Sequence, residues 1–377
     1  MKIAIVFESV FPEYKGGIER WYMKLSRGLI EKGHSVVYLN ASDINEFRDG
    51  IEYICLTKKP WAYKKGGIRS KRQAISYSFS VFNWLNKNKI DAVYCSSVPL
   101  LSIFGVFLSG IFKKRKDIYE WFEIWPLRYW IRYSGHFIGP ISWVIQLIAI
   151  QATGIKTVFT KKAYEDIGSM TFYFRKKNIK LMDGLCESRF KTNIDASVKR
   201  NDILYLGRFV DEKQPLLALE AVKKFSESSW NGKFWLIGDG PVFEEINKKI
   251  KYLNMQEKVT ILRNASDSTV IEKFQSSFAL LHLSRREGYG LAVVEAAYND
   301  VPSILIHYPD NAAIDLQINP ELICKSDSIG TISEKLMYAF LNQKIIEIQT
   351  KTWVEMAIKS KSYQKTIDSI DKLLNSN

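Results

Sequence analysis

Apolar segments alternate with amphipathic ones along the first half of the chain. Residues 2–7 form a largely apolar run that is typical of a strand, and a glycine-containing loop follows it. Trp21, Leu25 and Leu29 then recur at the spacing of a helix that ends at Gly33, before a second strand. Further apolar segments, separated by helical stretches, indicate buried strands at 91–97, 117–125 and 155–160. Strands this apolar are covered on both faces, which predicts a parallel sheet between two layers of helices.

The same alternation restarts after residue 201. Apolar segments predict five more strands, at 202–209, 233–240, 258–262, 278–284 and 301–306. Amphipathic helices lie between several of these strands, and a long helical tail follows over residues 350–374. The fold class is therefore α/β, with two Rossmann-like βα domains. We expect a first domain at 1–195, a second at 196–350 and a C-terminal helix at 351–377, with the boundary near 192–201.

The net charge of +14 is concentrated in the first half of the chain. Residues 1–195 hold 31 Lys and Arg against 17 Asp and Glu, whereas the rest of the chain is balanced. Such asymmetry is typical of an anionic partner of one half. Nucleic acid, an acidic membrane surface and a phosphate-bearing substrate all fit, and so does a basic surface that only keeps the protein soluble.

Cysteine and histidine are too dispersed to indicate a disulfide framework or a metal centre. The four cysteines form no CxxC pair, which fits reduced thiols in the cytoplasm, and the four histidines are separate in the sequence. The N-terminal run suits a buried strand better than a signal peptide. Because no apolar run reaches about 18 residues, we expect no membrane-spanning helix.

Glycines and cations follow the strands of the second domain. Gly207 follows one strand, and Gly238 and Gly240 follow the next. Ligands of open α/β sheets bind beyond the carboxyl ends of the strands, where glycine lets the backbone approach them, although tight turns explain such glycines equally well. Arg208 and Lys213 flank the loop after Gly207, and two fixed cations there suit a diphosphate. The alternative is a pair of surface cations neutralised by the neighbouring Asp211 and Glu212.

The segment REGYGLAVVE holds two glutamates eight positions apart. Glu287 follows a predicted strand in a loop with Gly288 and Gly290, and Glu295 falls one to two turns into the helix predicted after Gly290. A carboxylate among the apolar neighbours of Glu295 is costly to bury without a partner. The two adjacent hydroxyls of a ribose are one such partner, and Glu287 would then meet a sugar further along the same ligand. The alternative is one solvated helix glutamate and one loop glutamate.

Taken together, GRFVDEK, LIGDGP and SRREGYGLAVVEAAYNDVPSI resemble the motifs of retaining family-4 glycosyltransferases of the GT-B fold, whose signature is a pair of glutamates separated by seven residues. GGIER near the start, IKLMDGLCESRF at 179–190 and the tail with Trp353 and Tyr363 extend the resemblance over nearly the whole chain. The resemblance implies two domains facing across a cleft, with acceptor bound by the first and donor by the second. It also implies that the C-terminal helix returns to the first domain.

The resemblance implies a role for each matching residue. Arg208, Lys213 and Glu287 would act in catalysis, with both cations on the diphosphate and Glu287 on the hydroxyls of the donor sugar. Glu295 would hold the ribose of the nucleotide sugar. The remaining donor-binding positions would be Gly207, Gly238, Gly288, Tyr289, Gly290 and Leu291, and the phosphate or acceptor loop of the first domain would be Gly16 and Gly17. No Asp-x-Asp motif is present, so we expect neither a metal nor another cofactor.

One departure from the family pattern lies in the first domain. Members of the family often carry a His–Asp pair after a strand there, whereas Phe122 takes the histidine position in this chain. Glu123 is then the candidate for a polar contact to acceptor or sugar, and Glu120 competes with it.

Two stretches of the first half are rich in aromatic, apolar and basic residues. Residues 98–116 form a glycine-broken apolar stretch that ends in four consecutive cations, Lys113 to Lys116, and residues 121–150 mix Trp and Tyr with Arg. Such mixtures favour a membrane interface, although core helices are the alternative. No nucleic-acid-binding motif is present, so an anionic membrane surface is the better partner.

The sequence therefore predicts a retaining, metal-independent hexosyltransferase. It would move a sugar from a nucleoside diphosphate to a glycan or lipid-linked acceptor, in glycan biosynthesis such as that of a cell-surface polysaccharide. We expect it in the cytoplasm, peripheral to the inner face of the cell membrane. A non-catalytic sugar-nucleotide-binding partner of another transferase and a GT-B sugar-nucleotide epimerase are the alternatives.

Overall fold

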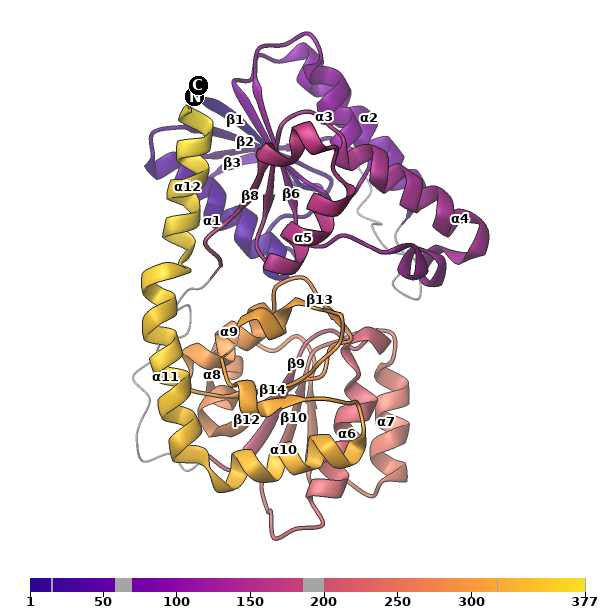
Figure 1. Ribbon diagram of the computed structural model, residues 1–377, viewed down its shortest axis with the longest axis vertical. Helices are drawn as coiled ribbons and strands as arrows, with labels where there is room; N and C mark the ends of the chain where they lie inside the picture. Colours follow the sequence, from indigo (N-terminus) through magenta and orange to yellow (C-terminus); the bar gives the residue numbers. More distant parts are fainter. Residues whose placement is uncertain (15, 58–69, 186–199, 317, 377) are drawn as a thin grey trace. The chain divides into compact units, whose positions relative to one another are not determined.

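The computed structural model describes the chain except for residues 15, 58–69, 186–199, 317 and 377 (Figure 1). It divides into two compact units. Unit 1 comprises residues 1–185 and 363–377, and unit 2 comprises residues 186–362. The chain thus passes between the units near residues 185 and 362, compared with the predicted limits of 195 and 350.

Unit 1 contains an eight-stranded sheet in the order β3-β4-β2-β1-β5-β6-β7-β8, with only β3 antiparallel among its described strands. Its strands are β1 (Lys2–Val6), β2 (Ser35–Asn40), β3 (Glu46–Arg48), β4 (Ile51–Cys55), β5 (Ala92–Ser96), β6 (Lys116–Trp121), β7 (Ile155–Val158) and β8 (Ile179–Leu181). Its helices are α1 (Gly17–Glu31), α2 (Lys71–Lys87), α3 (Ser102–Gly110), α4 (Leu127–Ile150), α5 (Lys161–Met170), η1 (Tyr173–Asn178) and α12 (Tyr363–Asn375). Most residues of the central strands are buried, as the unbroken apolar runs predict.

Unit 2 contains a parallel six-stranded sheet in the order β11-β10-β9-β12-β14-β16. Its strands are β9 (Asp202–Leu206), β10 (Phe234–Ile237), β11 (Val259–Leu262), β12 (Ser277–His282), β14 (Ser303–Ile306) and β16 (Ile323–Cys324), and a separate pair is formed by β13 (Arg286–Glu287) and β15 (Asp310–Asn311). Its helices are η2 (Asp211–Lys213), α6 (Pro215–Phe225), α7 (Phe243–Tyr252), α8 (Asp267–Ser276), α9 (Leu291–Tyr298), η3 (Ala312–Leu316), η4 (Pro320–Leu322), α10 (Ile329–Leu341) and α11 (Gln343–Ser360). The crossover between β9 and β12 puts a change of strand order at the centre of this sheet, where α/β proteins bind ligands.

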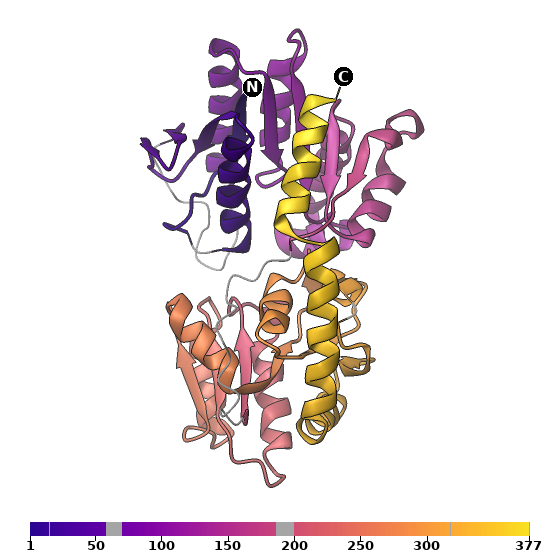
Figure 2. The same cartoon turned by 90° about the vertical axis from the view of Figure 1, so that its left-hand side faces the viewer.

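The helical tail is two helices, not one. It breaks between α11, in unit 2, and α12, which packs on unit 1 (Figure 2). His34 Nε2 lies 2.7 Å from Asp371 Oδ1, and Thr366 Oγ1 donates to the carbonyl of Gly184 at 2.6 Å. Both chain ends therefore lie at the same edge of unit 1 (Figure 1).

Helix α4 projects from unit 1 (Figure 1), and only Gly139, Gln146, Ala149 and Ile150 of it are buried. It is kinked at Gly135, where φ is +86°, and it contains Pro140. By length and composition alone it qualifies as a membrane-spanning segment, the only such helix in the described part of the chain. Length and composition do not show that α4 crosses a membrane, so the expectation of no membrane-spanning helix stays a prediction. That expectation rests on the lack of an unbroken apolar run of about 18 residues, and Arg132 and His136 interrupt the apolar stretch within α4.

The four consecutive cations at 113–116 do not form an open basic patch. The Arg115 side chain is only 1% exposed and is ion-paired with Asp117 at 2.8 Å. Lys113 donates to the carbonyl of Asn86, and Lys116 to the carbonyl of Leu374. Three of the four cations thus hold unit 1 together.

Candidate active site

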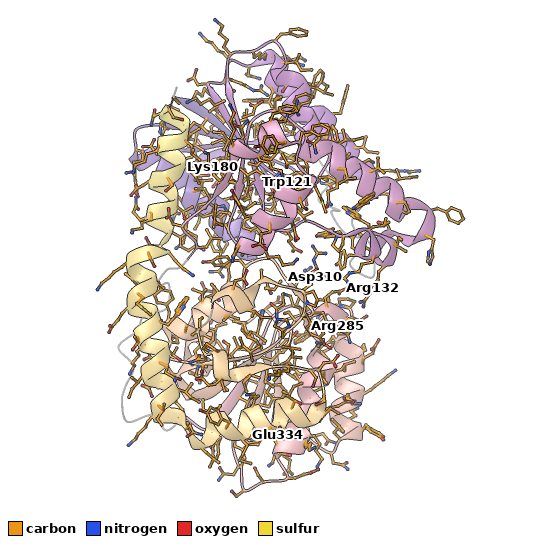
Figure 3. All side chains as sticks on the ribbon, viewed as in Figure 1. Trp121, Arg132, Lys180, Arg285, Asp310 and Glu334 are labelled. Atoms are coloured by element: carbon orange, nitrogen blue, oxygen red, sulfur yellow. The ribbon has the colours of Figure 1, made fainter. Side chains whose placement is uncertain are left out.

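The loop after β12 carries the first of the paired glutamates. β12 is buried along its whole length and lies at the centre of the sheet, between β9 and β14. The chain then forms β13, in which Glu287 is in register with Asn311 of β15. Figure 3 labels Arg285 just before β13 and Asp310 on its partner strand. This pairing fixes the backbone of Glu287 at the carboxyl edge of the sheet.

Gly290 lets the loop turn directly into α9. Its φ is +96°, and a Cβ there would lie 2.6 Å from the Cβ of Ala313. Tyr289 beside it is buried, and Leu291 is the first residue of the helix. Glu295 follows one turn into α9 as a half-buried side chain. The two glutamates thus lie on opposite sides of one tight, glycine-dependent turn.

The Glu287 carboxylate accepts two bonds on the same oxygen. Lys213 at the end of η2 donates to Oε2, and His282 Nε2, at the end of β12, lies 3.0 Å from it. Burial alone raises the pKa of Glu287, but the Lys213 charge and the His282 hydrogen bond outweigh it and hold that pKa far below its usual range. Glu287 is therefore an anion at any physiological pH.

The loops after β9 and β12 are fastened to each other. Gln214, in the left-handed region with φ of +52°, donates through Nε2 to the carbonyl of Leu283 at 2.6 Å. The backbone amide of Arg285 donates to the carbonyl of Glu212 at 2.8 Å. These bonds put Lys213 within reach of Glu287, although the two residues are 74 positions apart in the sequence.

Arg208 and the glycines that follow β9 and β10 also lie at the carboxyl edge of the unit 2 sheet. Arg208 is exposed just after β9. Gly207 and Gly238, which follow adjacent strands, approach so closely that a Cβ on Gly238, with φ of +155°, would lie 1.9 Å from the carbonyl oxygen of Gly207. The structure thus brings Lys213 and Glu287 together, whereas Arg208 remains at the surface.

In unit 1, Gly16 caps α1 and Gly17 begins it, after the loop that follows β1. The two candidate carboxylates near β6 lie in different surroundings. Glu120 is fully buried and accepts from Trp21 Nε1 and from the hydroxyl of Tyr94. Glu123 is half-buried in the loop after the strand. Glu120 is thus enclosed by the protein, which leaves Glu123 as the better candidate for a substrate contact.

Phe122 has no polar role in unit 1. It is buried and stacks on Phe159 with ring centroids 5.2 Å apart, and Phe159 in turn meets Trp21 edge-on at 5.6 Å. An aromatic cluster therefore occupies the position at which family members often carry histidine.

Sequence reasoning missed two side chains of the site. From the sequence, His282 is only one of four dispersed histidines, and Gln214 has no assigned role. A polar residue closing an otherwise apolar strand five positions before Glu287 is the signal for His282. The contact of Gln214 has no local signal, because it depends on how two distant loops pack. Within the described residues, no three His, Cys, Asp or Glu side chains come together as metal ligands.

Two βα units, each built on a sheet whose described strands are parallel except for β3, have the architecture of the GT-B fold. Residues 187–375 match the family Glycosyl transferases group 1, and the chain belongs to this family. It is therefore an enzyme that transfers sugar from a nucleotide sugar.

Solved structures share the fold over the whole chain. WaaG, a glycosyltransferase involved in lipopolysaccharide biosynthesis, has a TM-score of 0.74 at 16% identity, with both chains fully covered. Anabaena HepE in complex with UDP and glucose has a TM-score of 0.78 at 12% identity, again with both chains fully covered.

Curated relatives are similarly distant. The amylovoran biosynthesis glycosyltransferase AmsD of Erwinia amylovora is 22% identical over 280 residues, which are 72% of this chain and 73% of AmsD. A GalNAc-α-(1→4)-GalNAc-α-(1→3)-diNAcBac-PP-undecaprenol α-1,4-N-acetyl-D-galactosaminyltransferase of Campylobacter jejuni is 28% identical over 163 residues, 42% of this chain and 44% of that enzyme.

Proposed function

We propose that the protein is a retaining, metal-independent hexosyltransferase. The observation that carries this proposal is the pairing of Lys213 with Glu287 at the carboxyl edge of the unit 2 sheet. A cation and a buried carboxylate that share one site suit a donor with an anionic leaving group at one end and sugar hydroxyls at the other.

In the proposed reaction the bond between the sugar C1 and the diphosphate oxygen breaks, and its electron pair leaves with the diphosphate. Lys213 and Arg208 stabilise that developing charge without a metal. The acceptor hydroxyl oxygen bonds to C1 on the same face, and its proton passes to the departing phosphate oxygen. Glu287 holds the hydroxyls of the sugar, Glu295 the ribose, and Glu123 contacts the acceptor or the sugar.

UDP-glucose is the donor to test first. HepE, which shares the fold, was solved in complex with UDP-glucose. The released nucleotide and sugar are measured by chromatography, with EDTA and with added Mg²⁺. We expect turnover that EDTA leaves unchanged, a product with the anomeric configuration of the donor, and a loss of at least about tenfold for Glu287→Gln.

Each alternative has its own outcome in this assay. A non-catalytic partner binds UDP but never releases it from the donor. An epimerase changes the sugar while it remains attached to the nucleotide. Restoration of an EDTA-treated enzyme by Mg²⁺ would show that the leaving group needs a metal.

We further propose that the acceptor is lipid-linked and that unit 1 docks on the inner face of the cell membrane. One face of α4 beyond Gly135 is apolar and exposed, at the helical spacing of Phe137, Ile141, Val144 and Ile148. Phe137 alone is 89% exposed. Patches of this kind on a surface mark an interaction site.

Basic residues adjoin this face at both ends. Arg132 precedes the kink (Figure 3), and Arg175 and Lys176 lie in η1 after three exposed aromatics at 172–174. Gln151 at the end of α4 donates to the carbonyl of Met170 at 2.7 Å, which keeps the two segments together. An apolar face with flanking cations suits an anionic bilayer, to which each adjacent cation contributes about 1 kcal/mol.

Vesicle co-sedimentation tests the docking. We expect the wild type to pellet with phosphatidylglycerol vesicles, less so at high salt, and to stay soluble with phosphatidylcholine alone. The triple variant Phe137→Ser, Ile141→Ser, Val144→Ser should stay in the supernatant. Phe47→Ser is the control, since Phe47 is 75% exposed on β3. A wild type that never pellets, or that dimerises through this face, would refute the proposal.

A further inference from the structure

His282 lies at a buried position of the unit 2 sheet, beside the candidate active site. It ends β12, in register with Leu305 of β14, and it is only 5% exposed. Lys213, the other partner of Glu287, ends the short helix η2 and reaches the carboxylate through a flexible four-carbon stem. One partner of Glu287 is therefore fixed by the sheet, whereas the other is able to move.

The two partners have different uses once a donor binds. If Lys213 stabilises a diphosphate, as the proposed function requires, it shares its charge with the phosphate oxygens and weakens its bond to Glu287. A buried carboxylate needs a remaining hydrogen-bond donor. His282 is that donor in the structure, 3.0 Å from Oε2.

The hydrogen bond also fixes which part of Glu287 faces a substrate. An ionised carboxylate only accepts, so the hydrogen must be on Nε2 of His282. Among the described residues, both bonds to Glu287 end on Oε2. Oε1 thus remains available for a sugar hydroxyl. Loss of the His282 bond would let the carboxylate rotate and remove this orientation.

We infer that His282 is a positioning residue: it holds the Glu287 carboxylate in place while Lys213 passes from Glu287 to the diphosphate of the donor. This inference rests on the proposed function. It separates two tasks that the lysine–glutamate pair would otherwise share, orientation of the sugar and neutralisation of the leaving group.

Three substitutions test the position of the donor atom. The amide nitrogen of His282→Gln falls near the place of Nε2, whereas that of His282→Asn falls near Nδ1 and is too short to reach Glu287. His282→Leu has no donor. We expect kcat with UDP-glucose to fall at least tenfold in the Asn and Leu variants and to stay within about threefold in the Gln variant. The Kd for UDP should change less than threefold in all of them, because UDP lacks the sugar.

A second histidine–carboxylate pair provides the control. His34 and Asp371 lie 2.7 Å apart in unit 1, and both His34 and His282 have side chains that are 6% exposed. His34→Asn and His34→Leu should lower Tm but leave kcat of the folded protein unchanged. Equal kcat in all three His282 variants, or losses that follow Tm alone, would overturn the inference.

Nitrogen NMR of histidine-labelled protein provides a readout apart from turnover. The chain has four histidines, so the signal lost in His282→Gln assigns His282. We expect a hydrogen-bonded Nε2–H in the free protein and in the UDP complex. Loss of this signal with UDP would overturn the inference. If the wild type binds UDP but releases no glucose from UDP-glucose, the result counts against the proposed function. The NMR signal of Nε2–H in the UDP complex then shows whether His282 still holds Glu287.

Discussion

The indole Nε1 of Trp21 lies 2.6 Å from Oε1 of Glu120 and joins α1 to the end of β6. The hydroxyl of Tyr94 donates to the same oxygen at 2.7 Å. Burial raises the pKa of Glu120 to about 7, despite these hydrogen bonds. α1, whose first residues are candidates for the phosphate or acceptor loop, is thus anchored to a carboxyl group that titrates near neutral pH.

Glu120→Gln should remove a pH-dependent cost to stability. The folded-state pKa of Glu120 lies above its ordinary value of 4.5, so the native state binds the extra proton between pH 4.5 and about 7. Stability from this group is present at low pH and lost as pH rises towards 7. The amide keeps the accepting oxygen and has no charge to bury. The variant should therefore gain stability relative to the wild type from pH 5 to pH 8, by up to about 3 kcal/mol in the free energy of unfolding. This gain is measured as a growing difference in Tm.

The control for this experiment is Glu52→Gln, because Glu52 is 51% exposed and pairs only loosely with Lys2. Its thermal midpoint should follow that of the wild type at each pH. A constant difference between Glu120→Gln and wild type from pH 5 to pH 8 would contradict the titration of Glu120.

Lys213→Met and Glu287→Gln should each destabilise unit 2 more than the double variant does. Removal of Lys213 leaves a buried carboxylate short of one partner, which costs about 3 kcal/mol, whereas removal of both charges leaves none to compensate. Thermal denaturation of the two single variants and the double variant at pH 7 measures this coupling. Additive losses would mean that the two side chains do not interact in solution.

Glu295→Gln should weaken binding of the nucleoside diphosphate. The proposed ribose contact loses a charged acceptor but no volume. The Kd for UDP, measured by calorimetry, should therefore rise by an amount that corresponds to a loss of about 1–3 kcal/mol in binding free energy. The control is Glu334→Gln, an exposed glutamate of α10 in the same unit (Figure 3). An unchanged Kd in Glu295→Gln would refute the ribose assignment.

The hydrophobic pattern of the sequence predicts the central strands of both sheets, because a buried parallel strand needs only a short apolar run, whereas β3, β4, β8 and β16, at or next to the sheet edges, are not predicted. β14 falls within the predicted strand at 301–306, and β12 overlaps the one predicted at 278–284 in all but its first residue. β13 and β15 were missed, because two residues carry no periodicity. The pairing of these short strands nevertheless fixes Glu287, so the loop that matters most to the site was the least predictable part of unit 2.

Charge was harder to predict than fold, because local sequence does not show what a side chain packs against. Lys113 to Lys116 resemble a surface patch in the sequence, yet Asp117 and distant carbonyls bind three of them. Glu287 and Lys213 were both predicted from motifs. Their direct contact was not, since it depends on the bonds that fasten two loops 74 positions apart.

Gly290→Ala should disturb both stability and donor binding, because Gly290 separates the two paired glutamates. A non-glycine residue at φ of +96° is strained by roughly 1–2 kcal/mol, and its Cβ would lie 2.6 Å from the Cβ of Ala313 in η3. Relief of that clash moves either the start of α9 or η3, and the first of these shifts Glu295 relative to Glu287. We expect a lower Tm together with a Kd for UDP raised at least fivefold. Gly330→Ala in α10 is the control, since its nearest neighbour would be the flexible end of Lys224 at 3.4 Å, and it should preserve both values. If Gly290→Ala lowers Tm but binds UDP as the wild type does, the turn supports only the fold, and α9 does not position the donor.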